Sequence, residues 1–150
     1  EEVLMTRNRP VPAIPAEEAA YARSLVLHED NSIIAFNKPA GLAVQAGHGI
    51  ARSLDDLMAA FAKSNGKRPR LVHRLDQGTS GVIVAAKTQP VAAKLSEAFA
   101  GRDVQKTYLA LVKGRLPTAD TGVIEAALVK VEEGGKARMI IARPDRKGAQ

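Results

Sequence analysis

The sequence contains no cysteine, and this absence removes several kinds of chemistry. Without thiols the chain has no disulfide framework, no thiolate nucleophile and no cysteine-based zinc site. It also contains no run of about 18 consecutive apolar residues, and its first residues, EEVLMTRNRP, lack the apolar centre of a signal peptide. We therefore expect a protein of the cytoplasm that is neither secreted nor inserted into a membrane.

Aromatic residues are also scarce, at 3% of the chain, with two Tyr, three Phe and no Trp. So few rings cannot form a platform on which successive bases of a nucleic acid stack. The net charge of +6 nevertheless favours a polyanionic partner, because Lys and Arg that neutralise phosphates release counterions. Basic proteins that bind nothing charged are also common. If RNA is the partner, we expect contacts mainly with backbone phosphates and with a single extruded base.

Prolines near the start of the chain separate a short linker from the rest. Pro10, Pro12 and Pro15 each fix their own backbone angle and disfavour helix in the preceding residue. Residues 1–15 are therefore expected to form an extended linker, and residues 16–150 to form one domain. Because the first residue is Glu rather than Met, we expect a further segment upstream.

Hydrophobic periodicity and turn residues predict mostly strands, with two isolated helices. One helix follows Ser53, a plausible N-cap with Asp56 three residues later. The segment 81–87 reads as a strand buried on both faces. The other predicted elements are a hairpin of strands 24–28 and 32–37, a helix at 91–100 that ends at Gly101, and strands at 106–112, 122–131 and 137–142. We therefore expect an α+β fold with a mixed, mainly antiparallel sheet and a few flanking helices.

The segment RLVHRLDQGTSG, residues 70–81, holds the main candidate for chemistry. In an extended segment Arg74 and Asp76 face one way, while His73 and Leu75 face the other. The following Thr-Ser-Gly is typical of a tight turn that would hold the carboxylate in place. An ionised aspartate can act as nucleophile or base, whereas arginine can only donate. A surface loop with one ion pair would have the same sequence.

Other kinds of site find less support. The three histidines have spacings that match no metal-ligand signature, so no metal is expected; they are His28, His48 and His73. Ser80 with His73 and Asp76 lacks the Gly-x-Ser-x-Gly elbow of a serine hydrolase. Glycosidase chemistry needs a second carboxylate across a cleft, and three residues remain open for that role: Glu29, Asp30 and Asp55.

Three segments together resemble the RluA-type pseudouridine synthases, which isomerise uridine within RNA. They are NKPAGLAVQ at 37–45, RPRLVHRLDQGTSGVIVAAKT at 68–88 and QKTYLALVKG at 105–114. Their order and separations are similar to those of the family. The resemblance is close over residues 24–115 and loose elsewhere.

The resemblance implies a role for three residues and no cofactor. Asp76 would be the catalytic carboxylate, required to break the bond between uracil N1 and ribose C1′ and remake it at C5. Arg74 would take the place of the flipped base or hold the backbone of its nucleotide, and Tyr108 would lie against the uracil. The RNA would be large-subunit ribosomal RNA or transfer RNA. Attack of Asp76 on C1′, attack on C6 and abstraction of a ribose proton all remain open.

Basic residues of the resembling segments have less specific expectations. Lys38 is expected to support the active-site loop, with a phosphate contact as its second possible role. Lys67, Arg68 and Arg70 form a basic cluster that is either a solvated loop or a set of RNA-phosphate contacts.

The resemblance is incomplete at the C-terminal end. Relatives continue into a sheet segment with a Thr-Gly-Arg type motif whose arginine pairs with the catalytic aspartate, and residues 1–150 contain no match. We therefore expect a partial catalytic domain that is inactive in isolation, and an RNA-binding module of the ribosomal-protein kind upstream. Two competing functions are a non-catalytic RNA-binding module, against which retention of Asp76 argues, and a nucleoside or glycoside hydrolase that uses Asp76. The sequence predicts no oligomeric state.

Overall fold

A computed structural model of the protein describes residues 14–101, 103–115 and 121–142. The chain divides into two compact units, Glu1–Thr107 and Tyr108–Gln150, and each has a sheet of its own. The boundary lies inside the range 16–150 that the sequence analysis treats as one domain. The predicted linker at residues 1–15 falls almost entirely outside the described residues.

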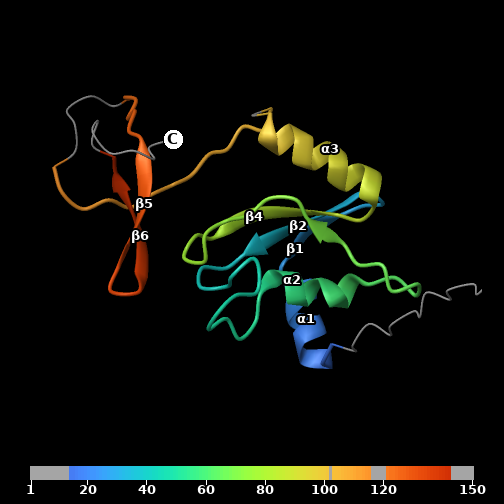
Figure 1. Ribbon diagram of the computed structural model, residues 1–150. Helices are drawn as coiled ribbons and strands as arrows, with labels where there is room; N and C mark the ends of the chain where they lie inside the picture. The colour runs from blue at the N-terminus through green and yellow to red at the C-terminus, as the bar shows by residue number, and fades with distance from the viewer. Residues whose placement is uncertain (1–13, 102, 116–120, 143–150) are drawn as a thin grey trace, which may run out of the picture. The chain divides into compact units, whose positions relative to one another are not determined.

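The first unit is built on a four-stranded sheet in which every pair of neighbours is antiparallel (Figure 1). The order across the sheet is β1-β2-β4-β3. The predicted hairpin is confirmed, and the carboxylate of Asp30 holds its turn by accepting hydrogen bonds from the backbone N–H groups of Ser32 and Ile33 at 2.6 and 2.8 Å. The strands are β1 (Val26–Glu29), β2 (Ile33–Lys38), β3 (Arg70–Leu71) and β4 (Gly81–Ala86).

Helices cover both faces of this sheet, as Figure 1 shows, with α3 on one side and α1 and α2 on the other. The predicted capping box is confirmed, because Ser53 and Asp56 each bond the other's backbone N–H. That helix is shorter than predicted and changes to a 3-10 turn. The helices are α1 (Ala16–Ser24), which was not predicted, α2 (Leu54–Leu57), the 3-10 turn η1 (Met58–Phe61) and α3 (Gln89–Ala100). None of the helices in the described residues is long and apolar enough to cross a membrane.

The core lies between the two central strands and the helices α1 and α2. Side chains from β2 and β4 meet side chains from α2 and η1, and the largest of them have no exposed surface. Val82 of β4 is 58% exposed, but Val84 on the same face is half-buried and Ala86 is 1% exposed. The second face of β4 is therefore buried in part, whereas burial on both faces was predicted. The large apolar side chains that are fully buried are Ile34, Phe36, Leu54, Leu57, Met58 and Ile83. The central strands therefore give the first unit a rigid base for the loops at their ends.

The second unit contains a β-hairpin of β5 (Leu128–Glu133) and β6 (Lys136–Ile141). Gly134 and Gly135 form its turn with φ angles of 59° and 75°, which side chains disfavour. β5 is shorter and later than the predicted strand 122–131, and β6 matches the predicted strand 137–142 closely. The predicted strand 106–112 is wrong: this segment is irregular and, within the described residues, pairs with no strand.

Candidate active site

The segment that leads from β3 toward β4 alternates between buried and exposed residues, as predicted. His73 is half-buried and Leu75 is 9% exposed, while Arg74 and Asp76 are exposed. Buried neighbours thus fix the backbone on either side of Arg74, and its charged side chain remains in solvent. No ion pair joins Arg74 to Asp76 in the described residues.

His73 anchors this segment to the strand β4 and the helix α3. The backbone N–H of Val84 donates to Nε2 of His73 at 2.9 Å, and the imidazole stacks on Phe99 with ring centroids 4.1 Å apart. Pairing of β3 with β4 stops at Leu71, so the ring occupies the acceptor position that the next strand residue would otherwise fill. Burial lowers the pKa of His73, and the positive charge of Lys106 adds to this effect. The neutral ring therefore accepts at Nε2 and carries its proton at Nδ1.

Asp76 begins a tight turn whose hydrogen bonds come from the backbone. The N–H of Thr79 donates to the carbonyl of Asp76 at 3.0 Å. The turn was predicted, but hydroxyl groups of Thr79 and Ser80 make no hydrogen bond within the described residues, so they do not pin the carboxylate. The loop 39–42 holds the turn instead: the N–H of Gly41 donates to the carbonyl of Gln77 at 2.7 Å, and Nε2 of Gln77 donates to the carbonyl of Gly41 at 3.1 Å.

Lys38 lies beneath these two loops and has no exposed surface. Its ammonium donates to the carbonyls of Pro39 at 3.1 Å, Leu42 at 2.8 Å and Gln77 at 3.2 Å. An ammonium has three N–H donors, and all three are used here. Burial lowers the pKa of Lys38, while the negative charge of Asp76 acts in the opposite direction. We refer to Lys38 and its three carbonyl partners as the lysine clamp.

The lysine clamp agrees with one expectation for Lys38 and argues against the other. Lys38 supports the loop that faces the Asp76 turn, as the sequence analysis expected. Its second expected role, a phosphate contact, is incompatible with a fully buried ammonium whose donors all reach backbone carbonyls. The sequence could not indicate this, because the partner carbonyl of Gln77 lies 39 residues away in the chain.

A pocket of about 670 Å³ borders the same pair of loops. Gly41 and Gln77, which join the loops, both line it, together with Tyr21 and Arg52. The guanidinium of Arg52 lies over the Tyr21 ring, 4.8 Å from its centroid, and forms an ion pair with Glu18 at 3.7 Å. Asp76 itself does not line this pocket; the turn that it begins borders the pocket through Gln77.

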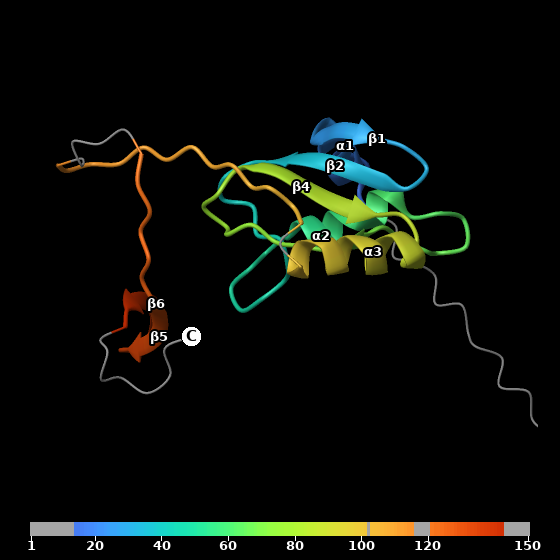
Figure 2. The same cartoon turned by 90° about the horizontal axis from the view of Figure 1, so that it is seen from above.

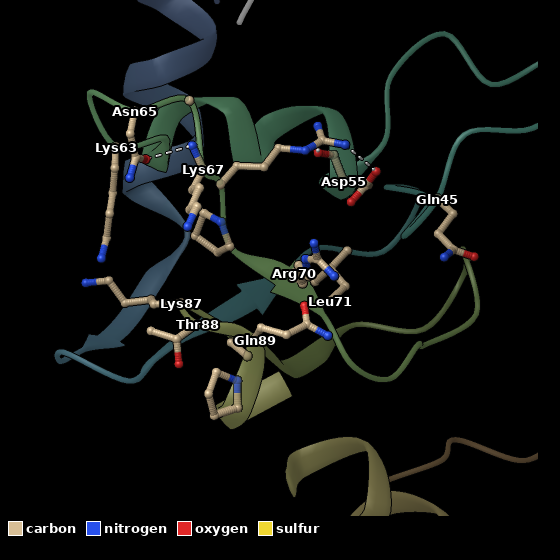
Figure 3. A pocket seen from close by; sticks show the side chains of 15 residues that line it. Gln45, Asp55, Lys63, Asn65, Lys67, Arg70, Leu71, Lys87, Thr88 and Gln89 are labelled. Atoms are coloured by element: carbon tan, nitrogen blue, oxygen red, sulfur yellow. Dashed lines mark hydrogen bonds and ion pairs between the residues drawn. The ribbon is translucent and has the colours of Figure 1, made fainter. Parts of the chain in front are cut away.

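The predicted basic cluster lies at the other end of β4. Lys67, Arg68 and Arg70 line a pocket of about 910 Å³, shown in Figure 3. Arg68 is engaged there by Asp55, whose carboxylate accepts from Nη2 at 3.3 Å and whose carbonyl accepts from Nη1 at 3.2 Å. The sequence analysis missed Lys63 and Lys87, which line the same pocket.

Comparisons with known proteins show which family this chain is similar to. Residues 32–148 match the family model described as RNA pseudouridylate synthase. The chain is 41% identical over 140 residues to "RNA pseudouridine synthase 4, mitochondrial" of Arabidopsis thaliana, covering 83% of this chain and 29% of that protein. It is 43% identical over 105 residues to "Ribosomal large subunit pseudouridine synthase C" of Rickettsia bellii, covering 70% of this chain and 34% of that protein.

The chain belongs to the RNA pseudouridylate synthase family. The solved structure "Human RNA Pseudouridylate Synthase Domain Containing 4" agrees, with a TM-score of 0.62 and 25% identity over 89% of this chain and 54% of that one. The α+β class and the resemblance stated from the motifs are thereby confirmed. The chain spans about a third of the length of the curated relatives it matches.

The matched range contains every residue that the sequence analysis assigned to the site. It begins at Ser32, within the hairpin turn, and so excludes the helix α1. Tyr108 is the first residue of the second unit and is 60% exposed, and its contact with a uracil remains a prediction. In the described part of the chain, no three or more His, Cys, Asp or Glu residues are grouped to hold a metal ion. His28, one of the histidines considered for a metal, instead contacts Asp30 at 3.2 Å.

Proposed function

We propose that the protein to which this chain belongs is an RNA pseudouridine synthase with Asp76 as its catalytic carboxylate. The observation that carries the proposal is the family match across residues 32–148, which contains the exposed Asp76 turn. In this reaction the bond between N1 of uracil and C1′ of ribose breaks. A bond between C5 and C1′ forms, the proton of C5 is lost to water, and N1 takes up a proton in place of its bond to C1′. Atoms and electrons balance without an oxidant, a reductant or a cofactor.

The exposed position of Asp76 suits a uridine that is flipped out of an RNA helix into the site. A uridine in a stacked helix is inaccessible, so it must be flipped out at a cost of a few kcal/mol. Arg74 lies two residues from Asp76 and is also exposed, so it can hold the backbone of the flipped nucleotide or fill the place of its base. Tyr108 supplies the aromatic face against which the uracil would lie.

The loops around Asp76 hold the backbone from which its carboxylate extends. A catalytic group gains rate when its position is set before the substrate arrives. The lysine clamp and the two hydrogen bonds between Gly41 and Gln77 fix the turn from below. A carboxylate on a mobile loop would lose this advantage. The chemical route, through C1′, C6 or a ribose proton, is left open.

Release of tritium from RNA that contains 5-tritiated uridine tests the proposal. We expect the protein to release tritium to water, because the new bond is made at C5. Release of free uracil without transfer of tritium would instead favour the nucleoside or glycoside hydrolase. Binding of RNA with neither product would favour the non-catalytic RNA-binding module. Asp76→Asn is the matched control, since it removes the ionisable carboxylate and keeps the side-chain volume.

For the RNA substrate we propose ribosomal RNA of the large subunit. The support is the name of the Rickettsia bellii relative, which refers to the ribosomal large subunit. The same tritium assay with separately labelled ribosomal and transfer RNA distinguishes the two candidates. Release from transfer RNA alone would contradict this proposal and leave the isomerase activity standing.

A further inference from the structure

The pocket at the Ala86 end of β4 has a strongly basic lining (Figure 3). Its volume is about 910 Å³, and five cations and one carboxylate line it. Asn65 and Gln89 add neutral hydrogen-bonding groups. The cations are Lys63, Lys67, Arg68, Arg70 and Lys87, and the carboxylate is Asp55. We call this pocket the basic groove.

Two of the five cations are neutralised by acids, and three are not. Arg68 pairs with Asp55 at 3.3 Å, and Lys87 pairs with Glu29 at 2.8 Å. The remaining three are exposed and, among the described residues, make no ion pair and no side-chain hydrogen bond; they are Lys63, Lys67 and Arg70. In the described part of the chain, the basic groove therefore has three exposed positive charges without an acidic partner, and these can contact an anionic ligand.

The loop that carries two of these charges is ordered by its own hydrogen bonds. The N–H of Lys63 donates to the carbonyl of Lys67 at 2.8 Å, and the N–H of Gly66 donates to the carbonyl of Lys63 at 2.8 Å. Asn65 accepts from the N–H of Lys67 at 3.0 Å. Gly66 has a φ angle of 77°, which a residue with a side chain rarely adopts. The two lysines are thus held together before any ligand binds.

The opposite wall adds further groups that favour an anion. Arg70 pairs with Ala86 across β3 and β4, which places Lys87 and the start of α3 at the same end of the sheet. In Figure 3 the side chains of Lys63 and Lys87 extend toward one another. Thr88 precedes α3 and makes no capping hydrogen bond, so its hydroxyl remains available at a helix end that carries partial positive charge.

We infer that the basic groove binds backbone phosphates of the RNA at a distance from the uridine that Asp76 converts. This inference rests on the proposed function for the identity of the polyanion. Lys38 pairs with Gly81 at one end of β4, whereas Arg70 pairs with Ala86 at the other. Six strand residues rise about 17 Å in total, so the groove and the Asp76 turn contact different nucleotides. The groove would position the RNA without reading its bases.

Affinity measured against salt concentration tests the inference with the whole chain. The variants are Lys63→Gln, Lys67→Gln and Arg70→Gln, singly and together, and the probes are an RNA stem–loop and a uridine trinucleotide. Each phosphate contact contributes about 0.7 to 0.9 to the slope of log K against log salt. The triple variant should bind the stem–loop about 10- to 100-fold more weakly, with a slope smaller by about 2. The triple variant should lose less affinity for the trinucleotide than for the stem–loop, because the trinucleotide has fewer phosphates to contact the groove.

Lys94→Gln is the matched control, because Lys94 is an exposed lysine on α3 without an ion pair in the described residues. It removes the same charge as Lys63→Gln and should leave the salt slope unchanged. Equal losses for the two variants would overturn the inference, as would a parent chain that does not bind the stem–loop. Binding to polyglutamate, an acidic polymer without phosphates, is a further comparison. A triple variant that loses affinity for polyglutamate but keeps its affinity for the stem–loop would also overturn the inference.

Gln89→Lys provides an independent variant that removes no contact. It adds a cation to the lining and should tighten stem–loop binding and increase the salt slope; no change in either would count against the groove. Tritium release separates this inference from the proposed function. If the parent protein converts uridine while the triple variant binds like the parent, only the groove fails. If the groove variants lose RNA affinity and the parent releases no tritium, only the isomerase assignment fails.

Discussion

The two ends of β4 use lysine in opposite ways. At the Gly81 end, Lys38 is fully buried, and its ammonium donates to three backbone carbonyls. At the Ala86 end, Lys63 and Lys67 are exposed and, in the described part of the chain, have no acidic partner. A buried ammonium must have its donors satisfied by the protein, whereas an exposed one is satisfied by water until a ligand arrives. Burial, rather than residue type, separates the structural lysine Lys38 from the lysines that we propose as RNA contacts.

Asp76→Asn should have the largest effect on function, on the proposal that Asp76 is the catalytic carboxylate. Loss of the ionisable group is expected to reduce tritium release by at least about 10³-fold. Affinity for the RNA stem–loop should stay within a factor of about two, since phosphate contacts dominate affinity. The groove variants, by contrast, should lose more affinity for the RNA stem–loop than Asp76→Asn does. Appreciable turnover by the Asn variant would remove Asp76 from the chemistry.

Lys38→Met tests whether the buried lysine at the Gly81 end of β4 has a structural role. The substitution removes the ammonium donor from the carbonyls of Pro39 and Leu42, whereas the carbonyl of Gln77 keeps the N–H of Gly41. Each unsatisfied buried group costs about 1–3 kcal/mol. We expect the free energy of unfolding to fall by about 3 kcal/mol in denaturant titration. Lys63→Met is the matched control and should change stability by less than about 0.5 kcal/mol. Similar values for the two variants would contradict the lysine clamp.

Gly41→Ala tests the loop that the lysine clamp supports. Gly41 has a φ angle of 91°, where a side chain strains the backbone, although an added Cβ would meet nothing within 4 Å. We expect a loss of about 1–2 kcal/mol in the free energy of unfolding. Gly78→Ala, in the facing turn, is the control, because an added Cβ there meets nothing within 4 Å and φ is not positive. A cost no larger at Gly41 than at Gly78 would show that the loop relaxes.

Protonation of His73 in acid should lower the free energy of unfolding, because the neutral ring anchors the Asp76 segment to β4. We expect this to be the smallest of the effects. Burial lowers the pKa of His73 from 6.5, so below pH 6.5 the unfolded chain binds a proton that the native ring resists. Stability is therefore greatest above pH 6.5, falls as the pH decreases through the lowered pKa, and then levels off. His73→Gln retains an acceptor but does not titrate. Its unfolding free energy should lack this pH dependence, and an unchanged profile would exclude His73 as the source.

Local sequence was sufficient for several elements of the first unit. The hairpin around Asp30 and the capping box of Ser53 and Asp56 depend on contacts between residues two or three apart. The helix α1 was not predicted, although its sequence AEEAAYARS is rich in strong helix formers. The segment 106–112 has strand-forming residues, but a strand requires a hydrogen-bonded neighbour, and the described residues supply none.

By itself the sequence determined the family, through three motifs, and the alternation that exposes Arg74 and Asp76. Both depend on order and spacing along the chain, which need no knowledge of distant contacts. Only the tertiary structure decided that Lys38 is a buried support and that Lys63, Lys67, Arg70 and Lys87 line one groove. The pairing of β2 and β3 with β4 decides both cases, because it sets which side chains lose water and which charges become neighbours.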